Sequence, residues 1–127
     1  MTKEKHGGKA ERREFKRWTV SIPCSVEWDD TIIEGIIDNL SYRGARITEM
    51  KVSPAEGTLV TVKFKVEEEA LKVEGVLTSR VIYTVREIRG GGARYSLGVE
   101  FQEPLENIST QLTRLLLRLR RRELENR

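Results

Sequence analysis

Two clusters of residues in the first half of the chain have types and spacings that suit binding of a phosphorylated, planar ligand. The first lies in ERREFKRW, where two arginines stand four residues apart with a third directly before them: Arg12, Arg13 and Arg17. A guanidinium group neutralises phosphate, forks onto O6 and N7 of guanine, and stacks on a base. These arginines are therefore candidates for gripping both the phosphate and the base of one ligand.

The second cluster is the stretch NLSYRGAR, in which Asn39, Ser41 and Gly44 follow the spacing N-x-S-x-x-G. The Asn39 amide can both donate and accept hydrogen bonds, and Ser41 offers a small hydroxyl donor. Gly44 either supplies a positive φ or removes a Cβ where a ligand approaches. Arg46 lies two residues beyond Gly44, so along a strand the two residues share a face.

Each cluster alone also has an explanation that involves no ligand. Among 15 arginines, roughly two R-x-x-x-R pairs arise by chance, and the pairs Arg114/Arg118 and Arg118/Arg122 are accounted for by a solvated helix face. Asn, Ser and Gly are ordinary turn residues. The order of the clusters is more informative. The arginines directly precede the first predicted strand, and Asn39 follows Arg17 by 22 residues, across one hairpin that could bring the two together.

Alternation of apolar and polar residues predicts the strands that position these clusters. In TVSIPCSVEW the apolar residues occupy every second position, which is the period of a strand with one buried face. Pro23 occupies one of the positions that alternate with the apolar residues, where a proline suits an edge strand or a bulge. Comparable patterns predict strands over residues 19–28, 31–38, 44–50, 58–67, 71–88 and 94–101. The run 71–88 fits one bent strand or two, with Gly75 marking a possible bulge.

After residue 104 the apolar period changes to that of a helix. One stripe is formed by Ile108, Leu112, Leu115, Leu116 and Leu119. Leu117 and Leu124 fall on nearly the opposite side, which suggests a contact with a partner or a homodimer. The arginines of this segment are expected at the surface. Short strands followed by one amphipathic helix predict a mainly β fold, a six-stranded antiparallel β-barrel with a C-terminal α-helix.

Composition limits the classes of function. The 127 residues suit one domain, no stretch is apolar enough to enter a membrane, and the N-terminus lacks the apolar run of a secretory signal. A single cysteine, Cys24, and a single histidine, His6, argue against a disulfide, a zinc site and a nucleophile–base pair. We therefore expect a cytoplasmic protein that is not an enzyme and holds no cofactor. Residues 1–18 and 105–127 are basic and the middle is acidic, so an anionic partner should meet an end first.

The arrangement of RREFKR before the first strand and NLSYRG after the first hairpin resembles the PilZ domain family of bacterial cyclic di-GMP receptors. The endings GARI and LGVEF also look like later strands of that family. The resemblance implies a PilZ-like barrel over residues 12–104 that includes the arginine arm, after a basic tail over 1–11 and before the helix over 105–127. It implies that Arg12, Arg13, Arg17, Asn39, Ser41 and Gly44 contact the ligand. Arg46 is a further candidate because it shares a strand face with Gly44.

An arginine directly before the R-x-x-x-R pair accompanies binding of an intercalated cyclic di-GMP dimer in that family, and Arg12 holds this place. The resemblance further implies a second-messenger adaptor that signals to an unidentified effector protein in motility, exopolysaccharide production or biofilm formation. Two alternatives stay open. One is a nucleic-acid-binding small barrel, against which the scattered aromatics argue. The other is a PilZ-fold interaction module without ligand. Trp18 and Trp28 are expected in the core or at the barrel rim.

Overall fold

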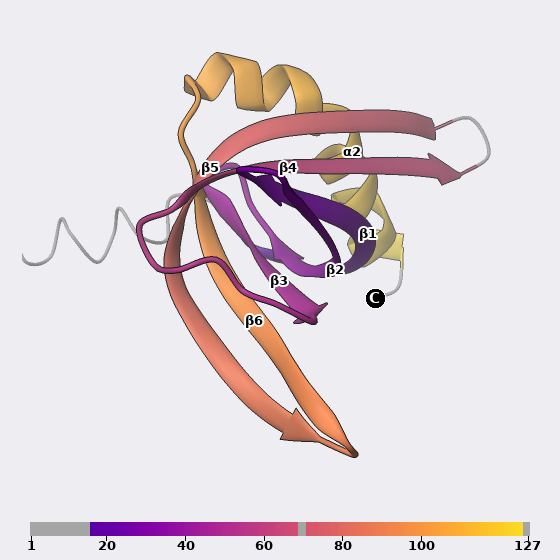
Figure 1. The fold of residues 1–127 in the computed structure, drawn as a ribbon. Helices are drawn as coiled ribbons and strands as arrows, with labels where there is room; N and C mark the ends of the chain where they lie inside the picture. Colours follow the sequence, from indigo (N-terminus) through magenta and orange to yellow (C-terminus); the bar gives the residue numbers. More distant parts are fainter. Residues whose placement is uncertain (1–15, 69–70, 126–127) are drawn as a thin grey trace, which may run out of the picture.

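In the part of the chain that the structure describes, six antiparallel strands close into a barrel in the order β1-β2-β3-β6-β5-β4, and helix α2 packs against it (Figure 1). The structure, a computed structural model, describes residues 16–68 and 71–125. The elements are β1 Trp18–Trp28, β2 Thr31–Leu40, β3 Gly44–Met50, β4 Leu59–Glu68, β5 Leu71–Arg89, β6 Gly92–Phe101 and α2 Leu105–Glu125. The predicted fold class is confirmed, and each predicted strand is present with bounds that agree to within two residues.

The barrel interior is filled by the apolar phase of every strand. In β1 the buried residues are Ile22, Cys24 and Val26, and they alternate with exposed or half-buried ones. Trp18 and Trp28 are partly buried at the two ends of the same strand and pack against the core, as predicted. Pro23 lies directly before the segment of β1 that pairs with β4, which suits a residue without an N–H.

β5 is a single 19-residue strand, and its irregularity does not lie at the predicted position. Gly75 pairs regularly with Phe64 of β4, so the expected bulge there is wrong. A Cβ on Gly75 would stand 2.1 Å from the Phe64 ring, so glycine makes room for an aromatic side chain in the core. The irregularity instead lies between Val81 and Tyr83, where one extra residue of β5 faces β6.

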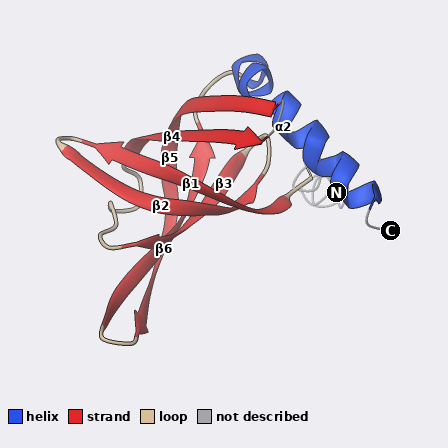
Figure 2. Cartoon of the chain, turned by 90° about the vertical axis from the view of Figure 1, so that its right-hand side faces the viewer, coloured by secondary structure: helices blue, strands red, loops and turns tan. Residues whose placement is uncertain are grey.

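Beyond the barrel, β5 and β6 continue as a long hairpin that projects from the body of the molecule (Figures 1 and 2). Its tip is the turn at Gly90–Gly91, and Gly90 has a positive φ of 53°. On this hairpin Arg89 forms ion pairs with Glu87 and with Glu49 at the end of β3. The pair with Glu49 connects the hairpin to β3.

Helix α2 covers the barrel with its predicted apolar stripe. Ile108, Leu112, Leu115 and Leu116 are buried, and Leu119 is partly buried against them. The Gln111 side chain accepts a hydrogen bond from the Val76 N–H of β5 (2.7 Å), which fixes the helix to the edge of that strand. Leu117 and Leu124 are exposed, as predicted, while their contact with a partner or a homodimer stays a prediction. Within the described ranges no helix combines the length and apolar character needed to cross a membrane.

Candidate functional site

The motif turn joins β2 to β3, and Ser41 holds it in shape. Ser41 is 6% exposed, and its hydroxyl oxygen accepts hydrogen bonds from the N–H groups of Arg43 (3.0 Å) and Gly44 (3.3 Å). The Ser41 N–H donates to the Gly44 carbonyl at 2.9 Å. Serine commonly closes a turn in this way. The Ser41 side chain therefore stabilises the turn, which is the explanation without a ligand that the sequence also allowed.

Gly44 is required by packing between β3 and β6. A Cβ at this position would stand 2.1 Å from the Val99 carbonyl oxygen. Gly44 is not among the glycines with positive φ, so the missing Cβ, and not backbone freedom, explains the residue. The turn is further tied to β6 because the Phe101 N–H donates to the Arg43 carbonyl at 2.8 Å. Both glycine and serine of the motif thus shape the end of the barrel.

Asn39 and Arg46 lie on the outer face of the barrel, side by side. They are Cα partners between β2 and β3, and their strand neighbours Leu40 and Ile47 point into the core with no exposed surface. The same register continues to Thr19 of β1 on one side, and to Gly98 of β6 and Tyr83 of β5 on the other. We call this set the outer row: Thr19, Asn39, Arg46, Gly98 and Tyr83.

Asp38 is a residue of this site that the sequence analysis did not single out. It lies at a register irregularity between Ile37 and Asn39, and its Oδ2 forms an ion pair with the Arg46 guanidinium at 3.0 Å. Its other oxygen, Oδ1, is buried without a hydrogen-bond partner among the described residues. The signal that could have revealed Asp38 is its acidic type directly before the motif, but its contact with Arg46 depends on the bulge.

Of the predicted arginines, Arg17 lies at the edge of this site. It is exposed and directly precedes Trp18, whose Cα partner is Leu40 next to Asn39. The antiparallel pairing of β1 and β2 thus brings the start of the first strand back to the motif turn, as the sequence order suggested. Lys16 stands over the Trp18 ring, 5.5 Å from its centroid. Arg12 and Arg13 lie outside the described residues.

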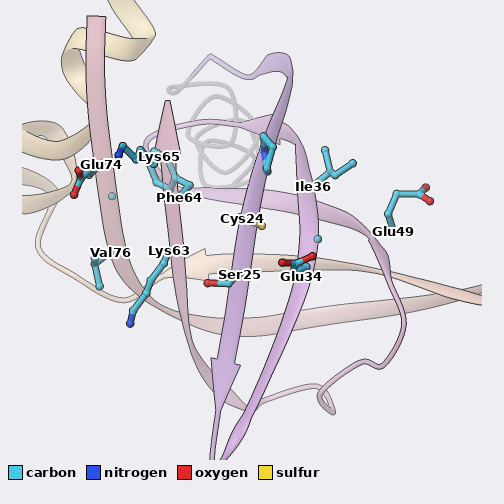
Figure 3. A pocket seen from close by; sticks show the side chains of 13 residues that line it. Cys24, Ser25, Glu34, Ile36, Glu49, Lys63, Phe64, Lys65, Glu74 and Val76 are labelled. Atoms are coloured by element: carbon cyan, nitrogen blue, oxygen red, sulfur yellow. The ribbon is translucent and has the colours of Figure 1, made fainter. Parts of the chain in front are cut away.

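Two hollows on the surface do not coincide with the outer row. The wider one, about 920 Å³, crosses the outer face of β2, β1, β4 and β5. Figure 3 shows Lys63 of β4 and Glu34 of β2 on either side of Ser25, so this hollow presents both charges. A smaller one of about 400 Å³ lies between the motif turn, the end of β6 and the start of α2, with Arg43 and Glu103 in its lining.

The described residues give little support to nucleophilic or metal chemistry. Cys24 is buried, and burial raises the pKa of its thiol from 9.0 to about 12, so it stays a neutral thiol. Within residues 16–68 and 71–125, no three His, Cys, Asp or Glu side chains gather as a metal site.

Comparison with known proteins connects this fold with one family. The sequence model described as the PilZ domain matches residues 11–118. A search of curated proteins finds none that matches the chain. Among solved structures, the chain is similar to the PilZ domain with c-di-GMP of YcgR from Escherichia coli. The TM-score is 0.69 and the identity 18%, over 91% of this chain and 96% of that one.

Two further structures are similar over most of this chain. The Bacillus subtilis inhibitor of motility, MotI/DgrA, has a TM-score of 0.67 and 17% identity, over 91% of this chain and 53% of that one. The chain therefore spans about half the length of that protein. The Borreliella burgdorferi PlzA protein in complex with c-di-GMP has a TM-score of 0.53 and 14% identity, over 94% of this chain and 57% of that one. At these identities the likeness shows the shared fold.

Proposed function

The chain belongs to the PilZ domain family, and from this membership we propose that it is a receptor for cyclic di-GMP. The observation that carries the proposal is the pairing of β1 with β2, which sets Arg17 beside the strand that bears Asn39. Two of the similar structures, those of YcgR and PlzA, are described with c-di-GMP.

The chemistry of the outer face supports this ligand. Cyclic di-GMP carries two phosphates and two guanines, and arginine both neutralises phosphate and binds the O6/N7 edge or face of guanine. Arg17 and Arg46 supply two guanidinium groups on either side of the Asn39 amide, and Arg12 and Arg13 precede them in sequence. Gly44 and Ser41 contribute by holding the turn beside which the ligand sits.

We propose that the protein acts as an adaptor in the cytoplasm and not as an enzyme. Ligand bound at the start of β1 changes the surface that an effector protein reads there. The B. subtilis structure to which the chain is similar is described as an inhibitor of motility, which makes motility one process to examine. Exopolysaccharide production and biofilm formation are others that the family membership suggests.

Isothermal titration calorimetry tests the receptor proposal. The wild-type chain should bind cyclic di-GMP but neither GTP nor a single-stranded oligonucleotide. Arg17→Ala should weaken binding about 10- to 150-fold, because a hydrogen bond to a charged group contributes about 1.5–3 kcal/mol. Arg114→Ala is the matched control, since Arg114 is an exposed arginine on α2. Arg13→Ala should behave like Arg17→Ala.

The outcomes separate the candidate functions. Binding of the oligonucleotide with no response to cyclic di-GMP would favour a nucleic-acid-binding barrel. Failure to bind any of the three ligands would leave an interaction module that retains only the fold. Wild-type affinity in Arg17→Ala would overturn the assignment of the arginine arm. Thermal unfolding of each variant checks that a loss of binding does not reflect a loss of structure.

A further inference from the structure

Tyr83, at the far end of the outer row, lies flat against the backbone of β6. A Cβ added to Gly98 would stand 2.1 Å from Cε2, 2.6 Å from Cζ and 2.7 Å from Cδ2 of the Tyr83 ring. One side of the ring therefore covers the glycine, while 40% of the residue is exposed to solvent. An aromatic ring held in this way presents a flat apolar face at the surface.

A bulge in β5 turns Tyr83 to the outside of the barrel. Val81 points into the core and pairs with Val99, and strand alternation would return the side chain of residue 83 to the core as well. The register shifts between Val81 and Tyr83, so Tyr83 pairs with Gly98 instead, and Ile82 is the extra residue. Bulges commonly redirect a side chain next to a functional site.

β2 contains a second bulge, which also turns a side chain of the outer row to the outside of the barrel. Ile37 points into the core and pairs with Ile47, while Asn39 pairs with Arg46 on the outer face. The extra residue, Asp38, shifts Asn39 from the inward to the outward phase. Two separate bulges thus bring an amide and an aromatic ring onto one row, with Arg46 between them. The bulge in β2 also turns Leu40, the residue after Asn39, into the core.

The spacing suits a ligand larger than a single ion. Neighbouring strands lie about 4.8 Å apart, so the backbones at Arg46 and Tyr83, two strands from each other, are separated by about 10 Å. Gly98 lies between them and adds no side chain to the surface. A flat base can therefore lie against the Tyr83 ring while an attached phosphate meets the Arg46 guanidinium.

We propose that Tyr83 is a stacking platform for one guanine of the bound cyclic dinucleotide and extends the binding surface from β2 and β3 across β6 to β5. This inference rests on the proposed function, whose motif residues belong to the arginine arm and the β2–β3 turn. Tyr83 adds recognition of a base by its face, which complements hydrogen bonding at the base edge.

The experiment is calorimetric titration of the full chain with cyclic di-GMP. Tyr83→Leu should weaken binding about 5- to 150-fold, the range that loss of one base–aromatic stack produces. Tyr83→Phe and Tyr83→Trp should keep affinity close to wild type, because both retain an aromatic face. Ile88→Ala is the matched control, since Ile88 is an exposed apolar residue of the same hairpin outside the outer row.

The readouts distinguish stacking from a structural role. If Tyr83 only shields Gly98, then Tyr83→Leu should keep wild-type affinity, and that result would overturn the inference while the receptor proposal stands. Equal loss of affinity in Tyr83→Phe and Tyr83→Leu would also overturn it, because stacking does not need the hydroxyl. A wild-type chain that binds no cyclic di-GMP would end both proposals. Thermal unfolding must show all variants folded, and Tyr83→Trp provides the folded aromatic replacement if Tyr83→Leu is unstable.

Discussion

Replacement of Asp38 by asparagine should strengthen cyclic di-GMP binding. In the ligand-free structure the Asp38 carboxylate holds the Arg46 guanidinium at 3.0 Å, and the two side chains are 30% and 47% exposed. An ion pair at such exposure contributes about 0.2–1 kcal/mol. A phosphate that takes Arg46 must replace this partner, so Asp38→Asn should raise affinity about 1.4- to 5-fold.

The assay is calorimetric titration of wild-type and variant chains at two salt concentrations, because a site freed of its carboxylate should depend more steeply on salt. Glu27→Gln is a closely matched control. It removes the ion pair with Lys63 (3.1 Å), whose side chains have similar exposures of 27% for Glu27 and 48% for Lys63. Unchanged or weaker binding in Asp38→Asn would refute the reasoning, since Asp38 would then position Arg46 for the ligand or contact the ligand itself.

Three further predictions concern stoichiometry, packing and pH. The wild-type chain should bind two cyclic di-GMP molecules and Arg12→Leu only one. Calorimetry on protein of known active fraction measures this stoichiometry, and a wild-type value of one would contradict the role of Arg12. Gly44→Ala should lower the free energy of unfolding by about 1–3 kcal/mol, because the alanine Cβ would clash with the Val99 carbonyl. A denaturant titration that shows no change in stability would contradict this. Burial raises the pKa of the Cys24 thiol to about 12. The contribution of this neutral thiol to the free energy of unfolding is therefore complete below about pH 9 and is lost as the pH rises toward 12. A thiol reagent at pH 8 should accordingly modify Cys24 only after unfolding.

The strands could be predicted because their patterns are local. Each depends on side chains two residues apart, so Val60, Val62 and Phe64 in β4 reveal the buried face without knowledge of any neighbour. The Gly75 prediction was wrong for the opposite reason. The reason for that glycine is the Phe64 ring on the adjacent strand, and the sequence contains no sign of which residue will face it.

In the candidate site, too, the features that depend on local sequence could be predicted and those that depend on contacts between strands could not. The types and spacing of Asn39, Ser41 and Gly44 identify the turn, but the tasks of Ser41 and Gly44 depend on contacts that only folding creates. Asp38 and Tyr83 could not be found by spacing at all. Each becomes relevant through a bulge, and the register that defines a bulge is a property of two strands together.

The construction of the outer row has a consequence for how binding and stability are coupled. Asn39 and Arg46 have their side chains on the outer face, but Leu40 and Ile47 beside them in the chain are fully buried and fix the strand positions. Substitution of the outward side chains therefore leaves core packing intact and should change affinity more than stability, since the Arg46–Asp38 ion pair contributes only about 0.2–1 kcal/mol. Gly44 and Gly98 behave differently, because each makes room for a group on a neighbouring strand, and substitution there should change stability first. Measurement of both quantities for each variant can thus separate residues that contact the ligand from residues that shape the surface beneath it.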